Sequence, residues 1–176
     1  MIYLKSNNKF FLENFSIFLT QENFNFTISK NENFFFVVSI DLYEKYLKIT
    51  SGDNSVSINC PARIQSIFSS IRNILIDKYV TTKNFNYSPI SQTLLIKDKS
   101  CILGSIHNLI ISNLIMNLED GIDKNFLYKQ IWPKDKDIQI NKLDTHITNL
   151  KNKIKNDLCL NIKIISIDGS LRLIID

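Results

Sequence analysis

Hydrophobic residues divide the first 80 positions into short strands and two helices. Apolar residues recur on one helical stripe in residues 9–22 and again in residues 62–78, so each stretch predicts an amphipathic helix. Shorter apolar or alternating runs predict strands at 1–5, 24–29, 35–40, 46–50 and 56–60. The run at 35–40 is continuously apolar apart from one serine, which is typical of a buried central strand. This order favours an α/β unit with a partly parallel sheet.

The pattern changes after residue 88. Residues 88–98 alternate as strands of a small sheet do, and helical spacing follows at 101–121, 124–132 and 141–155. Asp123 is placed to cap the second of these helices. Two alternating runs then surround Asp168-Gly169, a strong signal for a β-hairpin. Three helices followed by a hairpin predict a winged helix–turn–helix.

The helix at 141–155 has two chemically different faces. Its buried stripe is predicted to be Leu143, Ile147, Leu150 and Ile154. The opposite stripe carries amides and hydroxyls, and lysines 142, 151, 153 and 155 flank it. Lysine neutralises phosphates and asparagine can pair with an adenine edge, so this face suits a DNA major groove. The alternative is an ordinary amphipathic surface helix with a solvated polar side.

Composition limits the other possibilities. The chain has 176 residues, 44% of them hydrophobic, and a net charge of +4. The excess is +1 over residues 1–82 and +3 over residues 83–176, which leaves room for a local basic patch. The polar stretch 81–88 is predicted to be a linker between domains at 1–80 and 89–176.

Cysteine and histidine spacing indicates no metal site. Cys60, Cys101 and Cys159 are far apart, and His107 and His146 form no ligand pair, so we expect free thiols in a reducing compartment. We expect no metal, no cofactor and no membrane segment, and a cytoplasmic location. No glycine-rich phosphate loop or nucleophile–base motif is present, so we expect no enzyme activity and no catalytic residue.

The segment from Ile131 to Leu173 resembles the DNA-binding domain of OmpR/PhoB-type response regulators. The shared features are Ile131-Trp132, the Leu-Asp-Thr-His-Ile core at 143–147, the run 150–154, and the wing up to Leu171-Arg172-Leu173. The family usually has arginine where this chain has Asn141 and Asn149. Its wing usually reads Arg-Gly-x-Gly-Tyr, whereas this chain has Ser-Ile-Asp-Gly-Ser at 166–170.

The resemblance implies a role for each polar residue. Asn149 and Thr145 are expected to read bases, and Lys142 and Lys153 to hold phosphates. Lys163 and Arg172 lie on the wing, where the family meets DNA; ordinary strand-edge charge is the alternative. The complete set of expected DNA-binding residues is Asn141, Lys142, Thr145, Thr148, Asn149, Asn152, Lys153, Lys163 and Arg172.

Neighbouring residues are expected to be structural. His146 should pack at the edge of the buried stripe and bond to backbone. Asp144 should offset the helix dipole or pair with a neighbour. Trp132 should pack the base of the loop at 133–140, a loop that can touch RNA polymerase in the family; a plain surface loop is the alternative.

The opening residues 1–29 and the segment from Ile58 to Leu75 resemble the beginning and end of a bacterial receiver domain. A receiver has an acidic pair after its first strand, where this chain has Ser6 and Asn7, and a lysine before proline where it has Cys60. Only Asp41 could stand in the place of the phosphoacceptor. Without the acidic pair no magnesium site forms, so the resemblance implies a shortened pseudo-receiver that works without phosphorylation. An unrelated small α/β domain is the alternative.

Together these observations predict an α/β N-terminal pseudo-receiver plus an α+β C-terminal winged helix–turn–helix. The predicted function is a sequence-specific transcriptional regulator. Its partners would be double-stranded DNA with A·T-rich sites, a second copy through residues 62–78, and RNA polymerase through residues 133–140. The alternative is a protein–protein adaptor that keeps the winged fold and has lost DNA binding, which the missing arginines favour.

Overall fold

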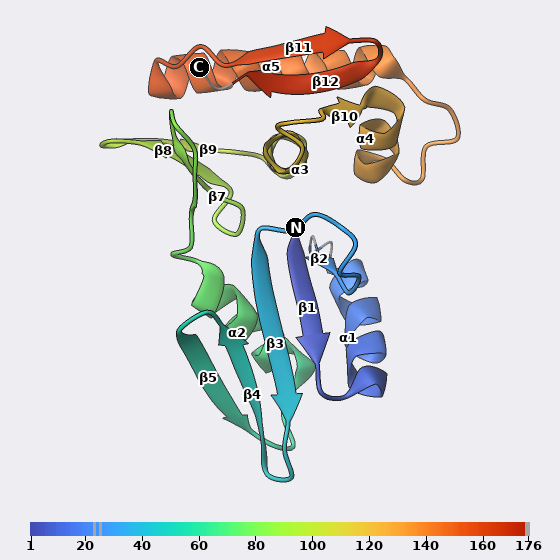
Figure 1. Cartoon of the computed structure of the whole chain (residues 1–176), viewed down its shortest axis with the longest axis vertical. Coiled ribbons are helices and arrows are strands. Elements are labelled where there is room, and N and C mark those ends of the chain that lie inside the picture. The colour runs from blue at the N-terminus through green and yellow to red at the C-terminus, as the bar shows by residue number, and fades with distance from the viewer. Residues whose placement is uncertain (23, 25, 175–176) are drawn as a thin grey trace. The chain divides into compact units, whose positions relative to one another are not determined.

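A computed structural model describes residues 1–22, 24 and 26–174 (Figure 1). Asn25 and Ile175, which fall in predicted strands, lie outside the described residues. The chain forms two compact units, residues 1–78 and 79–176. In the described part of the chain, no helix is long and apolar enough to cross a membrane. Residues 81–88, predicted to be a linker, contain strand residues of the second unit.

The first unit is built on a mixed five-stranded sheet of order β2-β1-β3-β4-β5. β1 pairs in parallel with both β2 and β3, and the remaining pairs are antiparallel. The strands are β1 (Ile2–Ser6), β2 (Phe26–Thr27), β3 (Phe36–Leu42), β4 (Tyr46–Ser51) and β5 (Asn54–Asn59). The mixed α/β sheet was therefore predicted, and the antiparallel meander β3-β4-β5 replaces the repeated βα units of a receiver.

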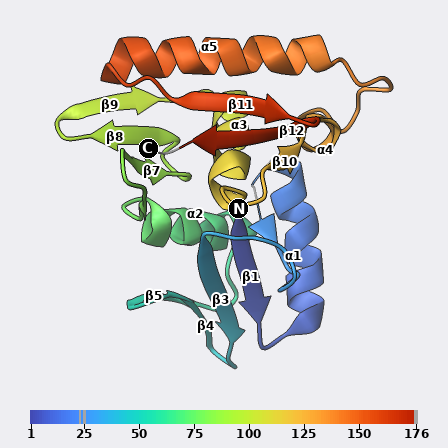
Figure 2. The same cartoon turned by 45° about the horizontal axis from the view of Figure 1, so that its top comes forward.

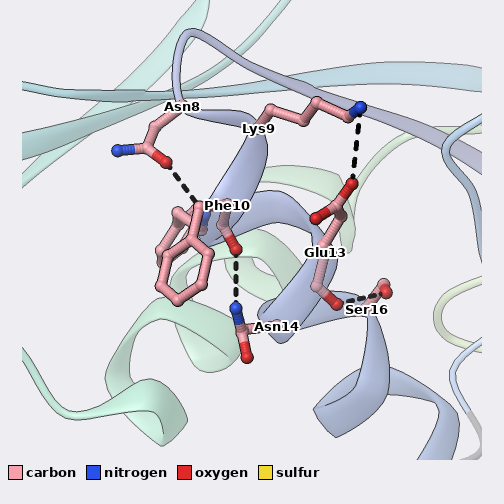
Figure 3. Close-up of polar contacts among 7 residues, drawn as sticks. Asn8, Lys9, Phe10, Glu13, Asn14 and Ser16 are labelled. Atoms are coloured by element: carbon pink, nitrogen blue, oxygen red, sulfur yellow. Dashed lines mark hydrogen bonds and ion pairs between the residues drawn. The ribbon is translucent and has the colours of Figure 1, made fainter.

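Two helices complete this unit, α1 (Lys9–Gln21) and α2 (Ile64–Leu75). Figure 3 shows the start of α1, where the Asn8 side chain accepts a hydrogen bond from the Phe11 N–H at 2.9 Å, as an N-cap does. The rings of Phe18 on α1 and Phe68 on α2 meet edge to face, with centroids 5.8 Å apart. Because the two helices touch, they cover the same face of the sheet.

Strand β3 is central in the sheet, but only one of its faces is fully buried. Val38 and Ile40 point to the helix-covered side with Leu47 and Ile49 of β4, and all four are almost inaccessible. On the other side Val37 is exposed, and Ser39 is half-buried. The run was predicted to be a buried central strand; β3 is central, but its second face is not buried, because both helices pack on one side.

The second unit combines two small sheets with three helices. A four-stranded antiparallel sheet has the order β6-β7-β8-β9, and a three-stranded sheet has the order β10-β12-β11. The strands are β6 (Val80–Thr81), β7 (Asn86–Ser88), β8 (Thr93–Ile96), β9 (Lys99–Ile102), β10 (Ile122–Asp123), β11 (Lys163–Ile167) and β12 (Ser170–Ile174). The helices are α3 (Ser105–Met116), α4 (Lys124–Ile131) and α5 (Ile140–Leu158).

One of these helices begins later than predicted. The helix expected from residue 101 begins at Ser105, because Cys101 and Ile102 belong to β9 and pair with β8. In α4 the buried residues are Leu127 and Tyr128, and Phe126 is 55% exposed.

A polar network is buried in the core of the second unit. The Tyr87 hydroxyl on β7 donates to the Asn108 side-chain oxygen at 2.6 Å and also contacts the Ser112 hydroxyl. The Asn108 amide donates to the Pro89 carbonyl at 3.2 Å. Burial raises the pKa of Tyr87, so it stays protonated. These bonds fix α3 against the small sheet, because breaking them would leave buried polar groups unpaired.

Candidate nucleic-acid interface

In a winged helix–turn–helix, the third helix and the β-hairpin after it are the elements that meet DNA. In this chain α5 and the β11–β12 hairpin occupy the corresponding places in the order of elements. Both views in Figures 1 and 2 show α5 running alongside this hairpin. Asp123 caps α4, because its carboxylate accepts from the Phe126 N–H at 2.8 Å, as predicted. α5 follows after a loop at residues 132–139.

That loop is anchored by Asp135. Its carboxylate accepts from the Tyr128 hydroxyl at 2.6 Å and pairs with the Lys142 ammonium at 2.9 Å. The hydrogen bond from Tyr128, then that from Lys142, lowers the pKa of Asp135. Lys142 also lies over the Trp132 ring, 4.3 Å from its centroid. Trp132 thus packs at the base of the loop, and the first turn of α5 is held there.

The faces of α5 follow the spacing of its residues. Five aliphatic side chains are buried on it: Leu143, Ile147, Leu150, Ile154 and Leu158. The exposed side carries a continuous strip of amide and hydroxyl residues, which we call the polar strip: Asn141, Thr145, Thr148, Asn149, Asn152 and Asn156. Asn156 was missed by the sequence analysis, because the helix extends beyond the predicted end at residue 155.

The polar strip differs along its length in how its hydrogen-bonding groups are used. Thr145 and Thr148 donate their hydroxyl protons to the backbone carbonyls of Asn141 and Asp144, at 2.8 and 2.9 Å. No hydrogen bond to another described residue is found for the side-chain amides of Asn149 and Asn152. These two amides are therefore free to bond to a ligand.

The cations around the strip fall into two groups. Lys142 pairs with Asp135, and Lys153 pairs with Asp157, each at 2.9 Å. The hydrogen bond that Lys153 donates to the Asp157 carboxylate raises the pKa of Lys153, so this lysine is charged. Among the described residues, no ion pair is found for Lys151 or Lys155. The two lysines predicted to clamp phosphates are thus already paired, and the two that the prediction left out are not.

Asp144 lies beside the polar strip and forms an ion pair within the unit. It pairs with Lys124 of α4 at 2.9 Å, which fits the expectation that it has a neighbouring partner. This ion pair joins α4 to α5, and the Asp144 carboxylate neutralises the charge of Lys124.

The wing is a tight hairpin. Asp168 and Gly169 have φ angles of 49° and 79°, and Ile167 pairs with Ser170 across them. Two successive positive φ angles define a type I′ turn, for which Asp-Gly is well suited. Lys163 is exposed at the start of β11. The stem of Arg172 packs over Gly121, where a Cβ atom would lie 2.7 Å from the Arg172 Cγ.

One polar atom of Arg172 is buried without a hydrogen bond. This atom is Nε, for which no hydrogen-bond partner is found in the described part of the chain. Arg172 is half-buried and lies opposite Ile165 on the wing. On the wing, Lys163 is thus the exposed cation and Arg172 the half-buried one.

His146 packs on aromatic rings. It lies 5.4 Å from the Trp132 ring and 5.9 Å from the His107 ring of α3, measured between centroids. The packing of His146 was predicted. The expected hydrogen bond to a backbone group is not found among the described residues, and His146 contacts two aromatic rings instead.

The C-terminal end of α5 meets β9 through two cysteines. Cys159 ends the helix in a left-handed conformation, with φ 56°, and Lys99 donates to its Sγ at 3.1 Å. Cys101 is buried, and burial followed by the Asp157 carboxylate raises its pKa to about 11. Both are free thiols, as is Cys60. The expectation of free thiols is thus confirmed.

In the first unit, the residues at the receiver-like positions are used structurally. The Ser6 hydroxyl donates to the Ile40 carbonyl at 2.5 Å, and the Asn7 amide pairs with both backbone groups of Leu42 at 3.0 and 2.8 Å. Asp41 lies nearby in β3 and accepts from the Ser39 hydroxyl at 3.0 Å. No group of three potential metal-binding side chains is found among the described residues.

No family model and no curated protein matches the chain, whereas solved structures do. One similar structure is the C-terminal domain of the nisin resistance regulator NsrR, a lantibiotic response regulator. It is 26% identical, with coverage of 55% of this chain and 96% of that one and a TM-score of 0.44.

Another similar structure is described as a member of a family of redox sensors in the streptococci that evolved from two-component response regulators. It is 14% identical, with coverage of 98% of this chain and 66% of that one and a TM-score of 0.43. The chain is structurally similar to this response-regulator domain and to this redox sensor.

Proposed function

We propose that the protein is a transcriptional regulator that reads A·T-rich DNA with α5. The observation that carries the proposal is the polar strip. It presents side-chain amides for which no hydrogen bond to another described residue is found, on an exposed helix face next to a β-wing. An asparagine amide can bond to adenine through two atoms in the major groove, and threonine methyl groups can contact the thymine methyl. The sequence resemblance to winged helix–turn–helix domains supports the same role.

The residues have distinct roles in this proposal. Asn149 and Asn152 read bases, with Asn141, Thr145 and Thr148 beside them on the strip. Lys155 and Lys151 are the first phosphate contacts, because no carboxylate neutralises them among the described residues. Lys142 and Lys153 contact phosphate only by exchanging their carboxylate partners. Lys163 and Arg172 approach the adjacent backbone from the wing.

The test is fluorescence anisotropy of the full chain with A·T-rich and G·C-rich duplexes over a salt series. Asn149→Ala should weaken binding to the preferred duplex by about 1–3 kcal/mol and reduce discrimination between the duplexes. Asn31→Ala, an exposed asparagine of the other unit, is the matched control and should leave binding unchanged. Lys155→Ala should weaken binding to every duplex alike and lower the salt slope by about one charge.

A specific observation supports a second candidate, a protein–protein adaptor. Lys124, Lys142 and Lys153 each have a carboxylate within 2.9 Å, which reduces the positive potential available to DNA. If the anisotropy experiment gives only weak binding that ignores sequence and vanishes near physiological salt, the adaptor becomes the better proposal.

We also propose that regulation does not use aspartyl phosphorylation at Asp41. The support is chemical: Ser6 and Asn7 stand where carboxylates would hold magnesium, and their side chains bond to the β3 backbone. Incubation with acetyl phosphate and Mg²⁺ should leave the chain unlabelled, as it should an Asp41→Asn variant. Labelling of the natural chain alone would assign Asp41 as a phosphoacceptor.

Two further partners complete the proposal. The loop at 133–140 is the proposed contact for RNA polymerase, with Lys134, Lys136 and Ile138 exposed on it. A homodimer through residues 62–78 is the proposed assembly. The exposed side of α2 there is polar, with Gln65, Ser69 and Arg72 outward, so α2 by itself offers little apolar surface for a dimer.

A further inference from the structure

Strand β5 ends the sheet of the first unit with one side unpaired (Figure 1). Its hydrogen-bond phase follows from the Cys60 N–H, which donates to the Lys45 carbonyl at 2.9 Å. Because bonded pairs alternate along an antiparallel ladder, Val56 and Ile58 turn their backbone groups toward β4. Ser55, Ser57 and Asn59 turn theirs toward the open side, and no bond from their N–H groups to a described residue is found.

This edge lacks the features that usually prevent edge pairing. Residues 54–59 read Asn-Ser-Val-Ser-Ile-Asn, with no charge and no proline. Natural edge strands are commonly protected by lysine, proline, bulges or short length. The opposite edge of the same sheet, β2, is only two residues long. The unit thus has one long unprotected edge.

The strand is self-complementary when two copies run antiparallel. A two-fold axis between the Ser57 residues of two copies pairs Ser57 with its counterpart and pairs Ser55 of each copy with Asn59 of the other. These are the residues whose backbone groups face the open side, so the pairs can form hydrogen bonds. Val56 of one copy then faces Ile58 of the other. Both side chains lie on the helix-covered face and are only half-buried in the single chain, whereas Leu47 and Ile49 beside them on β4 are fully buried.

We propose that two copies of this chain pair through their β5 strands into one continuous ten-stranded sheet. The pairing forms about six backbone hydrogen bonds and joins the half-buried Val56 and Ile58 of both copies. In each copy, the pairing occupies the one long edge strand described for this sheet. The two-fold arrangement therefore leaves no such edge for a third copy, and it gives a dimer instead of a fibre. It deepens the homodimer proposal, because α2 packs over β4 and β5 and the two α2 helices would share one face of the sheet. It does not rest on DNA binding.

The test is sedimentation equilibrium of the full chain without DNA, across a wide range of protein concentration. The expected mass is twice the 20.5 kDa of the single chain. Ser57→Asp should reduce it to the single-chain mass, because two carboxylates would meet on the axis. Within one chain the new carboxylate faces Lys48 across the β4–β5 pair, so the fold should be retained, with an unchanged circular dichroism spectrum.

Ser55→Asp is the matched control. It adds the same charge to the same strand but faces Asn59 of the other copy, so the dimer should persist. Ser57→Cys, made with Cys60→Ser and Cys159→Ser, should form an intermolecular disulfide on mild oxidation, because Cα atoms of a bonded antiparallel pair lie about 5.5 Å apart.

A single-chain mass at every concentration would overturn the proposal. A dimer that survives Ser57→Asp and forms no Ser57→Cys crosslink would also overturn it, and would place the interface elsewhere. Either failure leaves the comparison of Asn149→Ala with the natural chain interpretable, since that comparison reports on α5.

Discussion

We expect the stability of the second unit to depend on pH through His107 of α3, whose ring faces that of His146 on α5. Burial, then the nearby His146 and Lys153, lowers the pKa of His107 below its ordinary value of 6.5. Between the two pKa values the unfolded chain binds more protons than the folded chain, so stability rises with pH in that window. The free energy of unfolding should therefore fall as pH drops below 6.5 and level off beneath the folded-state pKa.

Urea unfolding at pH 7.5 and at about pH 5.5 checks this expectation. The variant His107→Gln removes the titrating group and should show a smaller loss between the two pH values, whatever its absolute stability. An equal loss in the variant and the natural chain would show that other groups cause the pH dependence.

At the scale of residues, the sequence predicted positions better than partners. The buried stripe of α5 was predicted fully up to Ile154, because a helix of regular period leaves no choice about which side is apolar. The pairing of Lys142 with Asp135 was not predictable, since it depends on how the loop folds back toward Tyr128. Lys153 and Asp157 are four residues apart, and that pair could have been found from spacing.

At the scale of elements, the capping of α4 provides a direct test of local design. The Asp123 carboxylate satisfies the Phe126 N–H, and Asp123→Ala should lower the free energy of unfolding by about 1 kcal/mol. Asp120→Ala, which removes a nearby exposed carboxylate with no hydrogen bond to a described residue, should have little effect. Thermal unfolding of the two variants measures the difference, and equal melting temperatures would contradict a capping role.

Most elements were predictable because hydrophobic spacing alone specifies them. The second unit was predicted to contain three helices and an Asp-Gly hairpin, and these elements are present. Errors arose where two elements meet without a polar break, as at Cys101 and Ile102, which are apolar and suit a helix as well as a strand. The one-sided sheet of the first unit was missed for a related reason, because Val37 is as apolar as Val38 yet lies on the uncovered face.

At the scale of the whole molecule, each unit has its own hydrophobic core. The proposed DNA recognition and the proposed dimerisation therefore belong to separately packed units. Residues of α3, α4, α5 and the wing bury one set of aliphatic side chains, and the first unit buries another between its sheet and its two helices. A compact unit with its own core can fold alone. The proposed DNA contacts all belong to the second unit, and the proposed β5 pairing belongs to the first.

This separation leads to a prediction for the fragment of residues 79–176. Since its core is self-contained, the fragment should give a cooperative thermal transition by circular dichroism. It should bind the preferred duplex more weakly than the full chain, by about 10²-fold or more, because a dimer gains affinity from two linked contacts with DNA. The full-length Ser57→Asp variant should bind as the fragment does, since both keep α5 and lose the pairing. A fragment that binds as tightly as the full chain would mean that the first unit contributes no affinity, and its role would then have to be sought in a protein partner.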